Sequence, residues 1–128
     1  MTGQAIEQEI QDKGLTAPRI TPADIQANIV SEHYFTASLG VLGHYAYHAD
    51  SETRVSDVMD VSPPLHESLD LLTFCVLVLR NGFTVTGESA CASPENFDAE
   101  IGRKIARDNA VQKVWPLMGY ELRSKLAG

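Results

Sequence analysis

The apolar run from Leu69 to Leu79 and the Arg80-Asn81-Gly82-Phe83 segment that follows it constrain the fold more than any other stretch. The run is too short to span a bilayer, which needs about 20 apolar residues, so it belongs in a protein core. Periodicity alone does not separate a buried helix from a buried strand in so short a run. The following segment is typical of a helix end, with a basic residue, a glycine for the left-handed position and an apolar residue that folds back. We therefore predict a central helix from Ser68 to Asn81.

Two further elements are predicted after this helix. The β-branched segment Thr84-Val85-Thr86 favours a short strand. A second helix is expected to begin at Ser93, which can cap it, with Pro94 at its first position, and to end before Pro116. Gly102 would allow a neighbour to approach this helix closely, and Trp115 would anchor it in the core. Its predicted buried face consists of Phe97, Ile101, Ile105, Ala106, Ala110 and Val114.

The first part of the chain contains one strong helix signal. Thr21-Pro22-Ala23-Asp24 combines a cap, a proline at the first position and an acidic residue of a capping box, and the helix is expected to run to about Phe35. Residues 1–14 favour a loose terminal helix through Ile6 and Ile10, which lie one helical turn apart.

The remaining segments complete the predicted domain organisation. Residues 38–65 are expected to form a loop or arm with a short helix around residues 54–59, and residues 117–126 a short final helix. A length of 128 residues suits one domain. We predict a flexible segment over residues 1–16 and a single helix-rich domain over residues 17–128. The predicted fold class is α+β, mostly α, with a short β element after the central helix.

The predicted central helix is apolar on most faces and needs covering on all sides. Three or four helices can barely cover it in so small a chain. We therefore expect a homo-oligomer, either a dimer or a larger assembly, and most simply a twofold dimer.

The charge of the chain is uneven. The whole chain carries a net charge of −7. Residues 1–73 hold 3 basic and 11 acidic side chains, a net of −8, whereas residues 94–128 hold 6 and 5, a net of +1. This acidity argues against bulk DNA or RNA binding, which relies on a basic surface, but it leaves room for one small anionic ligand.

The N-terminus and the two cysteines indicate the cellular compartment in which the protein acts. The first residues lack the basic start and the apolar stretch of a signal peptide, so neither export nor membrane attachment is expected. Two cysteines, Cys75 and Cys91, then suit a reducing compartment, with Cys75 as a small core residue.

The motifs for catalysis, cofactors and metals in this sequence each lack a required residue. Residues 82–89 have the spacing of a phosphate-binding loop, but Glu88 stands where its lysine belongs and would repel phosphate. Cys91 occupies the glycine position of a nucleophile elbow. His44 and His48 lack an acidic partner for a metal. We expect no cofactor and no metal, and the sequence favours a binding protein while leaving enzymatic activity open.

The positive end of the helix expected at Ser93 is the best candidate for a ligand site. Free backbone N–H groups at such an end favour an anion, and nearby arginines would add charge. A plainer alternative is that Asn96 and Asp98 cap the helix locally, and that Arg103 pairs with Glu100 or Asp108 on a solvated face. The candidate ligand-binding residues are Arg80, Ser89, Asn96, Arg103 and Arg107.

Three long segments carry a family resemblance. They are APRITPADIQANIVSEHYFTA (17–37), LLTFCVLVLRNGFTVTGESACASPENFD (71–98) and EIGRKIARDNAVQKVWPLMGYELRSKLA (100–127). Together they resemble the small tailed-phage proteins of the "gene product 49" family, with residues 38–65 as a longer connector than usual. The resemblance implies a phage-encoded protein acting in the infected cell, in the host cytoplasm. It implies no established activity and no catalytic residues.

Two functions fit these observations. The first is a non-enzymatic binding protein that sequesters a nucleotide-type host defence signal at the predicted anion site. The alternative is an interaction module that docks on a host or phage protein, using Tyr45 and Tyr47 of the predicted arm. A weaker third possibility is a hydrolase that uses Glu88 or Ser89.

Overall fold

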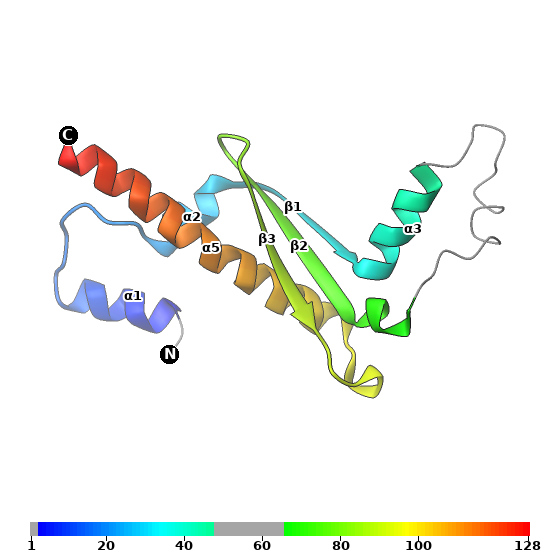
Figure 1. Cartoon of the computed structure of the whole chain (residues 1–128). Coiled ribbons are helices and arrows are strands. Elements are labelled where there is room, and N and C mark those ends of the chain that lie inside the picture. Colours follow the sequence, from blue (N-terminus) through cyan, green and yellow to red (C-terminus); the bar gives the residue numbers. More distant parts are fainter. Residues whose placement is uncertain (1–2, 48–65) are drawn as a thin grey trace.

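A computed structural model describes residues 3–47 and 66–128, and its helices and strands form an α+β fold that is mostly helical, as predicted (Figure 1). Three strands make an antiparallel sheet in the order β1-β2-β3, and the long helix α5 crosses it. The elements are α1 (Gly3–Asp12), α2 (Pro22–Asn28), β1 (Ile29–Thr36), α3 (Ala37–Tyr47), the 3₁₀ helix η1 (Glu67–Leu71), β2 (Leu72–Leu79), β3 (Thr84–Ala90), the 3₁₀ helix η2 (Pro94–Asn96) and α5 (Ala99–Ala127).

The centre of the fold is a strand, so the helix predicted over residues 68–81 is wrong. Only the first residues form a 3₁₀ turn, and β2 then runs between β1 and β3. Burial alternates strictly along β2, with Thr73, Cys75, Leu77 and Leu79 buried and the residues between them half-buried. This period of two belongs to a strand with one face in the core. Hydrogen bonds to the strands on both sides override the local helix signal.

The segment taken for a helix end is the turn of a hairpin. Gly82 has a φ of 87°, which glycine adopts without strain. The Leu79 N–H donates to the Phe83 carbonyl and the Gly82 N–H donates back to the Leu79 carbonyl. Asn-Gly between two β-prone runs is a hairpin signal. The strand predicted at Thr84–Thr86 is confirmed, and it continues to Ala90 as β3.

The helix that begins at Thr21 is confirmed at its start and wrong at its end. The Thr21 hydroxyl accepts from the Asp24 N–H at 3.1 Å, and the Asp24 carboxylate accepts from the Thr21 N–H at 2.9 Å, which completes the capping box. The helix stops at Asn28 rather than near Phe35, because the β-prone residues 29–36 pair with β2.

Helix α5 begins later and ends later than predicted. Ser93 makes no capping hydrogen bond and starts only η2, whereas Asp98 caps α5 by accepting from the Ile101 N–H at 3.0 Å. The helix continues through Pro116 to Ala127, so the separate helix expected over residues 117–126 is part of it. Pro116 is exposed, and Val114 and Met118 on either side of it pack in the core. This packing holds the helix together across the missing backbone donor.

The core lies between α5 and one face of the sheet. Gly102, Ala106, Ala110 and Val114 form the buried stripe of α5. The predicted burial of Ile101 and Ile105 is wrong, because their side chains are 56% and 46% exposed. Small residues are required on the stripe because Gly87 of β3 touches the backbone of α5. A Cβ at Gly87 would lie 2.2 Å from the Ala106 carbonyl oxygen. Trp115 packs partly buried against this core, as predicted.

Two helices, α1 and α3, lie in the segments predicted to be a loose terminal helix and a loop. The predicted N-terminal helix is confirmed as α1, and Arg19 ties it down by two hydrogen bonds to Glu7 at 2.7 and 2.8 Å. These bonds lower the pKa of Glu7 to about 2. Residues 37–47 form α3 rather than a loop, and the remainder of the predicted arm, including His48 and the helix expected around residues 54–59, lies outside the described residues. The flexibility of residues 1–16 stays a prediction.

Candidate functional site

A pocket with three aromatic side chains opens where β1 ends, α3 begins and α5 starts. It encloses about 120 Å³, which is below the roughly 300–1,000 Å³ of ordinary ligand pockets, so it can enclose one ring, and the rest of a larger ligand would lie outside it. We call it the aromatic pocket. It is lined by Tyr34, Phe35, Thr36, Leu39, Thr73, Phe97, Ala99 and Arg103.

Arg103 is the charged member of the aromatic pocket. Its side chain is exposed, and within residues 3–47 and 66–128 it forms neither an ion pair nor a hydrogen bond. The pairing with Glu100 that sequence allowed is taken instead by Lys104, at 3.2 Å. A guanidinium beside aromatic rings can bind a phosphate or a carboxylate while the rings stack on a planar group.

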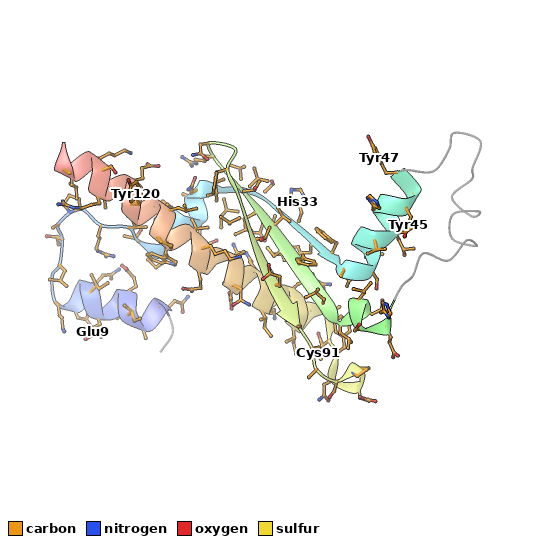
Figure 2. All side chains as sticks on the ribbon, in the orientation of Figure 1. Glu9, His33, Tyr45, Tyr47, Cys91 and Tyr120 are labelled. Atoms are coloured by element: carbon orange, nitrogen blue, oxygen red, sulfur yellow. The ribbon has the colours of Figure 1, made fainter. Side chains whose placement is uncertain are left out.

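Ser89 and Asn96 lie together in a second depression, on the β3 side of α5. Asp98 and Cys91 also line it, and Phe97 lines both this groove and the aromatic pocket. Cys91 follows the end of β3 (Figure 2), and its thiol donates to the Ser93 carbonyl at 3.2 Å. The Asp98 carboxylate brings negative charge to the start of α5, where the predicted site needs an anion to bind.

The structure separates the remaining two candidate residues from this end of α5. Arg80 lines a different depression at the far end of β2, beside Asp24 and Glu121, whose carboxylates disfavour an anion there. Arg107 is hydrogen-bonded to other residues of the protein. Its guanidinium donates to both carboxylate oxygens of Glu32 at 3.1–3.2 Å and to Gln26 at 2.6 Å. Of the five candidates, the structure brings together Ser89 and Asn96, and places Arg103 in the neighbouring pocket.

Glu32 stands at the centre of a polar cluster that joins β1 to α5. Besides Arg107, the Tyr34 hydroxyl donates to Glu32 at 2.6 Å. The hydrogen bonds from Arg107 and then from Tyr34 hold the pKa of Glu32 below its usual value. Burial, followed by the bond to Glu32, raises the pKa of Tyr34, and burial raises the pKa of the Cys75 thiol. These groups are therefore structural, with Glu32 charged and Tyr34 neutral at neutral pH.

Replacing Arg107 with alanine is expected to destabilise the fold and to flatten its pH dependence. The Glu32 carboxylate is 35% exposed, so a loss of about 1 kcal/mol at pH 7 is expected for the partly screened pair. Since folding lowers the pKa of Glu32, its contribution is complete above the unfolded value near 4.5 and disappears as the pH falls through the folded value. Urea unfolding at pH 7 and pH 3 should show a smaller gap between wild type and Arg107→Ala at pH 3 than at pH 7.

Lys104→Ala is the matched control, because it removes an exposed ion pair one turn earlier on α5. Its stability should equal that of wild type at both pH values. A pH-independent gap between wild type and Arg107→Ala would contradict the assigned role of Glu32.

No three His, Cys, Asp or Glu side chains are grouped for a metal ion within the described ranges. No helix that the structure describes is long and apolar enough to cross a membrane.

The aromatic residues of the pocket were missed as site residues. Tyr34 and Phe35 were assigned to a helix, and Phe97 was assigned to a buried helix face. Their meeting depends on β1 pairing with β2, which places Phe35 against Phe74 with ring centroids 5.5 Å apart. The available signal was the β-prone composition of residues 29–36.

The chain is an α+β protein in which one long helix packs on a small antiparallel sheet, with an aromatic pocket and an exposed arginine at the helix start. The model of the phage protein (N4 Gp49/phage Sf6 gene 66) family matches residues 20–126. The chain therefore belongs to this family of phage proteins, and the resemblance seen in the sequence is confirmed. No curated protein and no solved structure matches the chain.

Proposed function

We propose that this phage protein is a non-enzymatic binding protein that holds a nucleotide-type anion at the aromatic pocket in the cytoplasm of the infected host cell. The observation that carries the proposal is the placement of Arg103, which has no partner within the described residues, beside Phe35 and Phe97. A nucleotide offers a planar base for stacking and a phosphate for the guanidinium. Binding without turnover would lower the free concentration of a nucleotide signal used in host defence.

The pocket supports a site different from the one predicted at Ser93. Arg107 is taken by Glu32, and the Asp98 carboxylate lies at the helix start. We therefore propose that Arg103 binds the phosphate of the nucleotide and that the aromatic rings stack on its base. Ser89 and Asn96, in the neighbouring groove, could bind a ribose or a second nucleotide unit of a larger ligand.

Native mass spectrometry and titration calorimetry test this proposal. We expect gently purified protein to retain a nucleotide-sized adduct, or to bind at least one member of a panel of mononucleotides, cyclic dinucleotides and ADP-ribose. Arg103→Ala should weaken that binding at least about tenfold, because a charge-assisted hydrogen bond is worth about 1.5–3 kcal/mol. Lys104→Ala, the adjacent exposed cation, should leave the affinity unchanged.

Phe97→Leu should also weaken binding, since stacking contributes about 1–3 kcal/mol per base. Circular dichroism on each variant separates lost binding from lost folding. The absence of both a retained adduct and any binding across the panel would refute the nucleotide proposal.

The second candidate function, docking on a host or phage protein, is favoured by α3. This helix is apolar along its length, yet Leu39 and Tyr45 are 60% and 39% exposed and Tyr47 is 85% exposed. Figure 2 shows both tyrosines on α3, at the end of the sheet. Exposed aromatic side chains are enriched at protein interfaces. The same native mass spectra, recorded on protein purified from infected cells, would show a bound polypeptide in place of a nucleotide.

A further inference from the structure

The sheet has a second face that points away from α5. Residues opposite one another on paired strands share a face. Val76 lies opposite His33 and Thr86, so all three point to this side, whereas Cys75 and Leu77 face the helix. We call this surface the open face. It consists of Ser31, His33, Phe35, Phe74, Val76, Val78, Thr84, Thr86 and Glu88.

Within the described residues, the open face is covered at one end only. Helix α3 approaches the end formed by Phe35, where a Cβ at Gly40 would lie 3.4 Å from the Phe35 ring. Val76 and Val78 are only half-buried, and His33, Thr86 and Glu88 are exposed. The half-buried apolar row of the central strand thus keeps contact with solvent between two rows that are polar except for Phe35, and such a patch suits an interface.

The charges on the open face point to a second copy of this chain. The chain carries 17 acidic side chains and a net charge of −7, so most approaches between two copies bring carboxylates together. The open face holds one carboxylate, Glu88 on β3, and one imidazole, His33 on β1, on opposite sides of an uncharged centre. A strongly basic partner would find little to bind on this face, whereas another open face is complementary to it.

We propose that two copies associate through their open faces about a twofold axis that runs along β2. Such an axis places β1 of one copy across β3 of the other. His33 then faces the partner's Thr86 and reaches the partner's Glu88, which is the next residue on the same face. The imidazole donates to the carboxylate at both symmetric positions, and the Val76 rows pack together at the centre. Sheets packed in this way lie about 10 Å apart with strands about 30° off parallel.

The size of the open face sets the expected affinity. Three strands of seven residues cover a plane of roughly 14 by 23 Å, or about 300 Å², against about 800 Å² per partner in a standard interface. The apolar helix α3, at the end of the face, can add contact area through Leu39. We therefore expect a dimer with a dissociation constant on the order of micromolar. The dimer is tested at residues outside the nucleotide site: the open face shares Phe35 with the aromatic pocket, but His33, Val76 and Glu88 do not line that pocket.

Sedimentation equilibrium from about 1 to 200 μM tests the proposal, with wild type expected to show a monomer–dimer equilibrium. His33→Glu should weaken the dimer at least about tenfold, because it sets carboxylate against the partner's Glu88. Glu88→Lys should also weaken it, by removing the acceptor for the partner's His33. The double variant His33→Glu/Glu88→Lys should restore dimerisation, since a carboxylate on β1 then faces an ammonium group on β3 of the partner. Glu95→Lys, on η2, is the control for Glu88→Lys, because it makes the same change of charge away from the open face. It should leave the dissociation constant of the dimer unchanged.

Three results of these experiments would overturn the proposed dimer. A monomer at every concentration overturns the proposal. A dimer that tolerates the single variants and Val76→Glu uses another surface, which also overturns it. Weakening by both single variants without restoration in the double variant overturns the twofold axis along β2. His33 and Glu88 are exposed on the sheet, so their variants are expected to keep the wild-type circular dichroism spectrum.

Discussion

Gly87→Ala is expected to abolish or severely weaken folding. The added Cβ would meet three backbone atoms of α5, the Ala106 carbonyl oxygen at 2.2 Å and the Ala110 nitrogen and Cα at 2.3 and 2.9 Å. Backbone atoms cannot rotate away as a side chain can, so α5 must move off the sheet along its buried stripe. We expect a loss of more than about 3 kcal/mol, the upper end of overpacking costs, from a total stability of about 5–15 kcal/mol. Urea unfolding followed by circular dichroism measures it.

Gly119→Ala is the control for this substitution. Gly119 is also in an ordered element, α5, but a Cβ there would meet nothing within 4 Å. Alanine in a helix interior should raise stability by about 0.5–1 kcal/mol. A Gly87→Ala protein as stable as wild type would show that α5 does not contact β3 in this way.

Leu77→Ala is the second change with a large expected effect. Leu77 is fully buried in the middle of the central strand and faces α5. Truncation removes apolar contacts and leaves a cavity, which costs about 2–5 kcal/mol for a leucine of this kind. Chemical denaturation should report the loss as a lower urea midpoint with an unchanged slope.

The neighbouring Val76→Thr tests the strand directly. Val76 is half-buried on the open face, where the added hydroxyl can reach solvent and threonine keeps the β-branched shape, so the change should cost less than about 1 kcal/mol in the monomer. Midpoints at two protein concentrations separate any effect on self-association. Equal losses for both variants would argue against a strand with one face in the core, and would favour the helix predicted from sequence.

Local signals predicted the start of α2 and the glycine of the hairpin, but not the start of α5. The Thr21–Asp24 capping box needs only a side chain and a backbone group three residues apart, and it forms as expected. The glycine of the hairpin was placed correctly at a left-handed turn position, at Gly82. What the turn connects was wrong, because helix ends and hairpins use the same glycine chemistry.

Contacts distant in sequence explain the errors at the candidate site. Arg107 was predicted to bind a ligand, but Glu32, 75 residues earlier, occupies its guanidinium. Arg103 is one turn away from Arg107 on the same helix, and among the residues that the structure describes it lies beside aromatic side chains rather than a carboxylate. No local pattern separates these two arginines, since their difference lies in the residues of β1 that each one faces.

The amino-acid sequence was sufficient for the family, the α+β class, the apolar core segment and the capped first turn of α2. These features depend on side-chain chemistry within a few residues of one another, or on long strings shared with a family. The strand at the centre, the length of α5 through Pro116 and the assembly of the aromatic pocket required the folded chain. A strand takes its hydrogen bonds from other segments, and a pocket takes its walls from several elements, so neither is specified by local pattern.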